Sequence, residues 1–311
     1  MRRARLPVIA RRRAGLLFAV LLSAAAVLVA GSSTFVYEPA PVPTIAVTTP
    51  IPRKRPTPTF TPTPTFTAAQ REALTRTLRD YLDGRPGSLS LSVRDLTTGI
   101  SYTYGKGLRT ATASIVKVDI VMALLLKAQR RERPLTSAEK GLAERAITLS
   151  DNAAATALWH AIGGSAGLAS ANEELGLRDI DPGPGGAWGS TTTSAADQIR
   201  LLTALVSPDS PLGPDARRYV RRLMRDVAPD QAWGVSAAGD DAEIKNGWLP
   251  RDAHGGRWTV TSIGIVQKAG HRYLIAAVSE RHPTMQDGIE AIEHTAETVT
   301  EALTKTAPTE R

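Results

Sequence analysis

The spacing of hydrophobic residues changes along the chain, and each change predicts a different kind of element. Apolar positions recur at helical spacing over residues 68–83, which predicts an amphipathic helix. Residues 88–95 instead alternate between apolar and polar positions, with Leu89, Leu91 and Val93 on one face, which predicts a strand. A turn at Thr97-Thr98-Gly99 separates this segment from residues 100–104, so the two segments are expected to form a β-hairpin.

The remaining pattern places a helical region between two groups of strands. Residues 114–205 are mostly helical in pattern and are broken by Gly and Pro clusters. Three more strands and a long final helix are expected at 243–246, 258–266, 273–279 and 285–303. Strands on both sides of a helical middle predict an α+β fold. In this fold one antiparallel sheet is flanked by the N- and C-terminal helices on one face and carries an inserted all-helical subdomain.

The first 36 residues have the pattern of an export segment. Six arginines precede an apolar run from Ala14 to Ala30, and arginines on that side keep the N-terminus in the cytoplasm. Two outcomes are open. Continued to Val36, the run has 23 residues and is long enough to remain as a transmembrane anchor, because a span takes about 20 residues. Cleavage at Val29-Ala30-Gly31 would instead release a secreted protein.

Residues 37–66 are dominated by Pro and Thr, which cannot form a packed core and predict an extended spacer. A spacer between an anchor and a domain suits passage through a cell-wall layer. The predicted organisation is therefore an Arg-rich tip and signal or anchor segment, a linker, one folded domain and a short tail, over residues 1–36, 37–66, 67–305 and 306–311.

Composition narrows the chemistry further. The chain has no cysteine, which excludes disulfides, a thiolate nucleophile, a Cys-ligated metal and a lipidated N-terminal cysteine. The net charge of +8 arises in residues 1–55, which hold nine basic residues and one acid and leave 29 of each sign in residues 56–311. Because the body is neutral, no nucleic-acid surface is expected. The five histidines form no metal-spaced pair, so we expect neither a metal nor a cofactor.

Three short motifs carry candidate chemistry, and each is weak alone. Ser114 and Lys117 are one turn apart at the start of a predicted helix, so Lys117 can reach the Ser114 hydroxyl and act as its base if burial lowers its pKa. Ser137 and Lys140 have the same spacing, but a capping box explains them better. Ser150-Asp151-Asn152 alone suggests a helix N-cap, and Lys245-Asn246-Gly247 alone suggests a turn.

The order of the three motifs is more specific than any one of them. Within residues 68–303 the chain carries Ser-x-x-Lys, Ser-Asp-Asn and Lys-x-Gly in that order. The first lies at the start of a predicted helix, the second on a loop between helices, and the third on a strand beside the C-terminal strand pair. In this the chain resembles the class A β-lactamases and penicillin-binding serine hydrolases. The Thr191-Thr192-Thr193 run before the helical residues 195–205 also looks like the segment that follows the family's active-site loop.

The resemblance implies a role for each matched position. It makes Ser114 the acylated nucleophile, Lys117 the base and Ser150 the relay of a proton to the leaving nitrogen. It also implies an oxyanion hole formed by the backbone N–H groups of Ser114 and Trp248. The positions implied to bind the substrate and its carboxylate are Asn152, Lys245, Asn246, Gly247 and Trp248, with Asn246 standing where the family has Thr or Ser.

Two departures from the family bear on activity. Only 36 positions separate Ser114 from Ser150, so the helical subdomain is expected to be trimmed. Residues 177–190 contain no Glu to activate the water that releases the acyl group. Asp181 could take the place of this Glu, although its side chain is one methylene shorter. The alternative is that Asp181 is a solvent-exposed acid of the loop.

One competing motif is rejected. Residues 163–167 fit the Gly-x-Ser-x-Gly pattern around Ser165, but that motif follows a strand, whereas residues 153–162 are helical in pattern.

The sequence therefore predicts an exported serine hydrolase that is acylated by β-lactams or D-Ala-D-Ala-type peptides and releases the acyl group slowly. A D-Ala-D-Ala carboxypeptidase-like activity is one alternative. A non-catalytic envelope-binding or sensor ectodomain on the same fold is another. The expected partners are a small substrate of this type and, through the N-terminal segment, the membrane.

Overall fold

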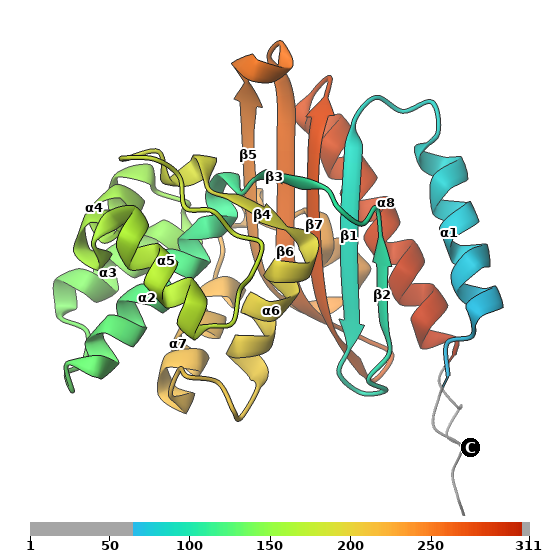
Figure 1. The fold of residues 1–311 in the computed structure, drawn as a ribbon. Coiled ribbons are helices and arrows are strands. Elements are labelled where there is room, and N and C mark those ends of the chain that lie inside the picture. The colour runs from blue at the N-terminus through green and yellow to red at the C-terminus, as the bar shows by residue number, and fades with distance from the viewer. Residues whose placement is uncertain (1–64, 307–311) are drawn as a thin grey trace, which may run out of the picture. The chain divides into compact units, whose positions relative to one another are not determined.

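The computed structural model describes residues 65–306, and the predicted anchor, its cleavage site and most of the linker lie outside that range. No helix within the described range is long and apolar enough to cross a membrane. The described chain is an α+β structure in which a sheet separates two groups of helices, as Figure 1 shows. The fold class predicted from the hydrophobic pattern is therefore confirmed.

The main sheet is antiparallel throughout and has the strand order β2-β1-β7-β6-β5. Its strands are β1 Ser88–Asp95, β2 Ser101–Tyr104, β5 Asp240–Arg251, β6 Arg257–Lys268 and β7 His271–His282. A separate two-stranded sheet pairs β3 Arg109–Ala111 with β4 Thr192–Ser194. The chain thus builds the β1–β2 edge first and resumes at the β5 edge, and its last strand, β7, closes the sheet between β6 and β1.

Strand β5 corrects one expectation. Residues 245–247 do not end a short strand, and Asn246-Gly247 is not a turn, because β5 continues to Arg251. Its pairing with β6 is continuous from Glu243 to Arg251. Backbone pairing with a long neighbour therefore outweighs the local turn preference of Asn-Gly, and places this motif in the middle of an edge strand.

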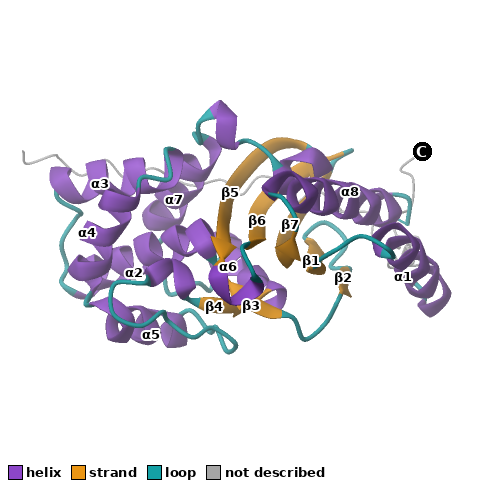
Figure 2. Ribbon diagram, turned by 90° about the horizontal axis from the view of Figure 1, so that it is seen from above, coloured by secondary structure: helices purple, strands orange, loops and turns teal. Residues whose placement is uncertain are grey.

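Helices α1 Ala68–Leu82 and α8 Met285–Thr304 lie together on one face of the sheet (Figure 2). They cover an apolar cluster that includes Leu91, Val93 and Ile292. Phe66 belongs to this cluster as well. Its ring is buried edge-on against Tyr102, so the folded body begins one residue earlier than the composition of the linker suggested.

The opposite face of the sheet carries the inserted helices, which begin after β3 and end before β5 (Figures 1 and 2). Helix α2 is their centre, and its apolar residues are buried on all sides. Thr136 and Glu139 form the predicted capping box at the start of α3. The inserted helices are α2 Val116–Arg130, α3 Ser137–Thr148, α4 Asn152–Ile162, α5 Gly164–Glu174, α6 Ala195–Val206 and α7 Pro214–Arg225.

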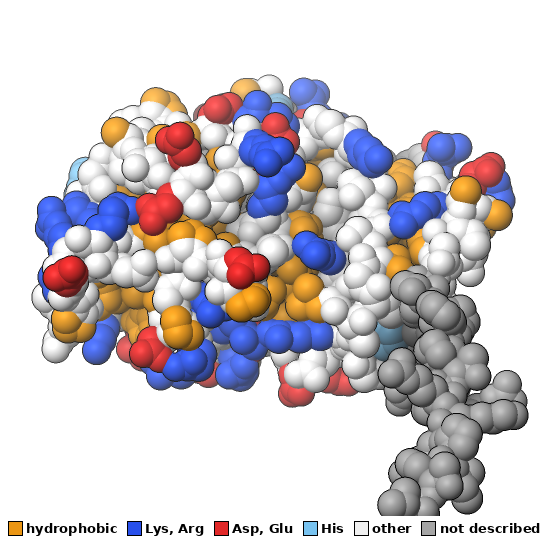
Figure 3. All heavy atoms as spheres, turned by 60° about the horizontal axis from the view of Figure 1, so that its bottom comes forward, with side chains coloured by type: hydrophobic (Ala, Val, Ile, Leu, Met, Phe, Trp, Pro, Cys, Tyr) orange, Lys and Arg blue, Asp and Glu red, His pale blue; other side chains and the backbone are white. Residues whose placement is uncertain are grey.

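Helix α7 is fixed to the start of β5 by charge. The Glu243 carboxylate is almost fully buried and pairs with the guanidinium groups of Arg221 and Arg225. Arg218 pairs instead with Asp215 on the same helix. On the surface shown in Figure 3, Lys and Arg side chains are interspersed with acidic, uncharged and apolar ones.

Candidate active site

The three sequence motifs meet between the inserted helices and the β5 edge of the sheet. Ser114 lies in a 3₁₀ turn, η1 Ala113–Ile115, immediately before α2, and is partly accessible to solvent. Its neighbour Ala113 has a positive φ of 49°, an uncommon conformation for a residue with a side chain. Such backbone strain persists only where the surroundings enforce it, and it often marks functional turns.

The Lys117 ammonium group joins the first motif to the second. Its Nζ donates to the carbonyl oxygen of Ser150 at 2.6 Å, to the Ser150 Oγ at 3.0 Å and to the Asn152 Oδ1 at 2.8 Å. The expected direct bond to the Ser114 hydroxyl is absent from the hydrogen bonds of the described residues. Lys117 is therefore held on the Ser150 side of the site, and reaching Ser114 requires it to exchange one of these bonds.

Ser150 occupies a strained turn between α3 and α4, with a φ of +55°. The N-cap role considered for this motif belongs to Asp151, whose carboxylate accepts the N–H of Ala154 at 3.0 Å. This frees the Ser150 side chain to face the site. Its hydroxyl also accepts a hydrogen bond from the Lys245 Nζ at 3.1 Å, so it lies between two lysines.

Both lysines are fully buried, which disfavours their charged forms. Burial lowers the pKa of Lys117 to about 8, against the opposing effect of the Asp151 carboxylate. Burial, and to a lesser degree the charge on Lys117, lowers the pKa of Lys245 to about 7. One shared hydroxyl between two such amines allows a proton to pass from one lysine to the other through Ser150.

Gly247 brings β5 against the Ser114 turn. A Cβ at this position would lie 2.5 Å from the Ser114 backbone nitrogen and 2.9 Å from the Thr112 carbonyl oxygen, so only glycine fits. Thr261 on β6 fixes the same junction by donating to the Thr112 carbonyl at 2.8 Å. Trp248 follows on β5, and its ring packs edge-on against Trp233 at 5.7 Å between centroids.

Asn246 differs from what the resemblance implied. Its amide nitrogen donates to the carbonyl oxygens of Gln231 and Trp233 at 2.7 and 2.8 Å, and its Oδ1 accepts from the Ser262 hydroxyl at 2.6 Å. Because both amide hydrogens are used and the side chain is buried, no donor is free for a substrate carboxylate. Asn246 instead fixes the segment after α7 to β5.

Gln231 was missed by the sequence reasoning. Its amide nitrogen donates to the Leu149 carbonyl at 3.1 Å, and its Oε1 lies 3.4 Å from the Lys245 Nζ. It therefore links the turn that carries Ser150 to the strand that carries Lys245. A lone glutamine in the stretch after α7 gives no motif, and only the folded backbone brings it to the site.

The loop over residues 177–191 supplies no carboxylate to this cluster. The Asp181 carboxylate is mostly exposed and pairs with Arg109 at 2.6 Å, and Asp179 is exposed as well. The proposal of Asp181 as a substitute base is therefore corrected, and the surface-acid interpretation holds. The side chain that the loop does place beside Lys117 is Trp188, whose ring centroid is 4.9 Å from the Lys117 Nζ.

The competing Gly-x-Ser-x-Gly motif has no strand before it. Helix α4 precedes it and Gly163 ends that helix with a φ of 101°. Residues 164–174 form helix α5, and the Ser165 hydroxyl donates to the Gly183 carbonyl oxygen at 2.6 Å. Ser165 thus anchors the 177–191 loop.

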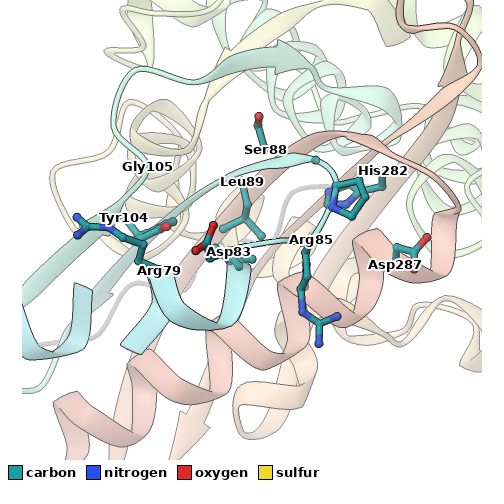
Figure 4. Close-up of a pocket in the computed structure, with 13 residues that line it drawn as sticks. Arg79, Asp83, Arg85, Ser88, Leu89, Tyr104, Gly105, His282 and Asp287 are labelled. Atoms are coloured by element: carbon teal, nitrogen blue, oxygen red, sulfur yellow. The ribbon is translucent and has the colours of Figure 1, made fainter. Parts of the chain in front are cut away.

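A cavity of about 410 Å³ lies away from this cluster, toward the β1–β2 edge of the sheet. Figure 4 shows it between the end of α1, the start of β1 and the start of α8. Its polar side chains include Arg79, Arg85 and Asp287, and the last of these caps α8 by accepting from the Thr284 backbone N–H and hydroxyl. Its lining includes none of the cluster residues Ser114, Lys117, Ser150, Asn152 and Lys245.

The comparisons with known proteins agree with this geometry. The sequence model of the Beta-lactamase enzyme family matches residues 138–303, which include the second and third motifs. The chain belongs to this family. In Mycobacterium tuberculosis and Mycobacterium bovis, the proteins named "Putative lipoprotein LppW" are each 26% identical to it over 212 residues, covering 66% of this chain and 67% of the relative.

Solved structures share the fold at lower identity. The TLA-3 extended-spectrum β-lactamase superposes with a TM-score of 0.68 at 14% identity, covering 75% of this chain and 99% of that one. A class A β-lactamase of Bacteroides cellulosilyticus gives 0.65 at 16%, covering 76% and 99%. PBP-A gives 0.63 at 22%, covering 75% and 96%. The α+β structure is therefore a class A β-lactamase fold.

Proposed function

We propose that this protein is an exported, penicillin-recognising serine hydrolase that forms an acyl-enzyme at Ser114. The observation that carries the proposal is the Ser150 hydroxyl, which lies within 3.1 Å of the amines of Lys117 and Lys245 beside the Ser114 turn. Burying two amines lowers the stability of the folded protein, because each loses its hydration. Their lowered pKa values suit them to proton transfer near neutral pH through the hydroxyl that they share.

Acylation uses these groups in sequence. Neutral Lys117 accepts the proton of Ser114 Oγ, either directly after exchanging a hydrogen bond or through Ser150. The oxygen then attacks the substrate's carbonyl carbon. When the carbon–nitrogen bond breaks, Ser150 gives its proton to the leaving nitrogen and regains one from Lys117. The products are an ester on Ser114 and an amine, which remains tethered to the acyl group when the substrate is a β-lactam and departs when it is a peptide.

The remaining site residues hold the substrate. The backbone N–H groups of Ser114 and Trp248 form the oxyanion hole, and Gly247 allows the two strands of backbone to approach. Protonated Lys245 attracts the substrate carboxylate. Asn152 presents its amide at the accessible side, where it can bond the substrate's own amide while it orients Lys117.

The substrate class is a β-lactam or a D-Ala-D-Ala-type peptide, and hydrolysis of the ester is slow because the 177–191 loop directs no carboxylate at it. Envelope localisation is supported by the mycobacterial relatives, which are named as lipoproteins. This chain lacks the cysteine that lipidation needs, so we assign attachment on the outer face of the membrane to the N-terminal apolar segment.

The test is adduct mapping. Incubation of the folded protein with a fluorescent penicillin, followed by proteolysis and mass spectrometry, should place one adduct on the peptide that contains Ser114. Ser114→Ala should abolish it, whereas Ser137→Ala should keep it, because Ser137 belongs to a helix start. An adduct on another serine contradicts the assignment, and reversible binding without any adduct supports a sensor ectodomain instead.

A further inference from the structure

The 177–191 loop packs directly on the turn that carries Ser114. The loop includes a second 3₁₀ turn, η2 Trp188–Ser190, and a Cβ at Gly189 would lie 3.9 Å from the Ala113 carbonyl oxygen. The Thr191 carbonyl then accepts the Thr112 N–H at 2.7 Å. The loop is therefore a wall of the site on the side where Lys117 meets Trp188.

Trp188 is held in this wall from both ends. Its indole N–H donates to the Thr156 hydroxyl on α4 at 3.1 Å, while its ring faces the Lys117 ammonium group at 4.9 Å. The cation is attracted to the electron-rich face of the ring, so both contacts favour one orientation. An aromatic ring in this place excludes water and offers no base.

The rest of the loop is fixed as well. The Trp159 indole donates to the Gly185 carbonyl at 2.9 Å, and the Gly183 N–H donates to the Thr191 hydroxyl at 3.0 Å. Asp181 exchanges two backbone hydrogen bonds with Thr192 at 2.9 Å each. These bonds leave the loop little freedom to swing Trp188 away from the site.

We infer that Trp188 keeps water from the Ser114 ester and so makes the acyl-enzyme long-lived. Hydrolysis adds a water oxygen to the ester carbon, breaks the bond to Ser114 Oγ and returns one proton to that oxygen, while a base accepts the other proton from water. Trp188 occupies the space beside Lys117 in which that water would meet a base. The inference rests on the proposed acylation of Ser114.

The experiment compares acyl-enzyme lifetimes of the wild type, Trp188→Ala and Trp258→Ala after removal of free penicillin, by intact-protein mass spectrometry. Trp258 is a partly buried tryptophan packed with the cluster on the other face of the sheet, so its variant is the matched control. Trp188→Ala should speed loss of the adduct by about 10- to 100-fold, below the full range of general-base assistance because an amine replaces the usual carboxylate. Trp258→Ala should not.

A second, more conservative variant tests the inference in case Trp188→Ala does not fold. Thr156→Val removes only the acceptor of the indole N–H and should shorten the adduct lifetime several-fold at an unchanged acylation rate. Unchanged lifetimes in the folded variants overturn the role of Trp188 while leaving the proposed function intact. Absence of any adduct on the wild type overturns the proposed function, and the inference with it.

Discussion

The Ser114 cluster and the 177–191 loop lie against each other but bear on opposite ends of the proposed catalytic cycle. In the cluster, Lys117 and Lys245 converge on one hydroxyl with lowered pKa values, which suits formation of an acyl-enzyme. In the loop, the acids face solvent and an aromatic ring faces the site. Under the proposed function, the groups for acylation and for hydrolysis of the ester therefore belong to separate parts of the fold.

The largest expected effect comes from removing the base of the cluster. Lys117→Ala should lower the maximal acylation rate by about 10²- to 10⁴-fold, the usual contribution of general-base catalysis. Stopped-flow labelling with penicillin measures it. Lys127→Ala is the control, because the Lys127 ammonium bonds the Ala161 carbonyl at the far end of α2. Equal rates in both variants would contradict the role of Lys117.

Lys245 should affect binding more than chemistry. Lys245→Ala removes the charge that attracts the substrate carboxylate, a charge-assisted bond worth about 1.5–3 kcal/mol, so affinity for carboxylate-bearing ligands should fall by about 10- to 150-fold. The maximal acylation rate should fall less than in Lys117→Ala. Pre-steady-state kinetics over a range of ligand concentrations separate the two quantities, and an identical loss of maximal rate in both variants contradicts the division of roles.

The pH dependence follows from the same two amines. Acylation needs neutral Lys117, so its maximal rate should rise with pH up to about 8 and then level. Binding of the carboxylate needs protonated Lys245, so affinity should fall as pH rises through about 7. Because the lysines share a hydroxyl, the measured values belong to the pair. A maximal rate that falls over this range would argue against an amine base.

The smallest effect is expected in the loop acid. Asp181→Asn breaks an exposed ion pair with Arg109, which costs at most about 1 kcal/mol of folding stability. The lifetime of the acyl-enzyme should not change. Thermal unfolding and adduct decay measure the two quantities, and a clearly longer lifetime in the variant would identify Asp181 as a base after all.

Much of the fold could be predicted because it depends on local spacing. The alternation in residues 88–95 and the helical period in residues 285–303 gave strands and helices that the structure confirms as β1 and α8. The order of the three motifs likewise indicated which residues meet. The spacing within each element and each motif involves neighbouring residues, so it can be recognised without knowledge of the tertiary structure.

The errors concern contacts between distant segments. Whether Asn246 faces substrate or the Gln231 and Trp233 carbonyls depends on what packs beside β5, which no local pattern reveals. Gln231 and Trp188 were missed because no motif links either residue to the lysine that it contacts, Lys245 or Lys117. The Lys117 amine was expected at Ser114, yet Ser150 and Asn152 offer it three acceptors.

The contrast between acylation and hydrolysis is tested most directly by a burst experiment with a chromogenic cephalosporin in excess over protein. The account predicts a rapid release of one equivalent of chromophore per protein molecule, followed by a slow steady rate, with the Ser114 adduct present throughout. Rapid turnover without a burst and without an accumulated adduct would contradict it, since hydrolysis would then be faster than acylation.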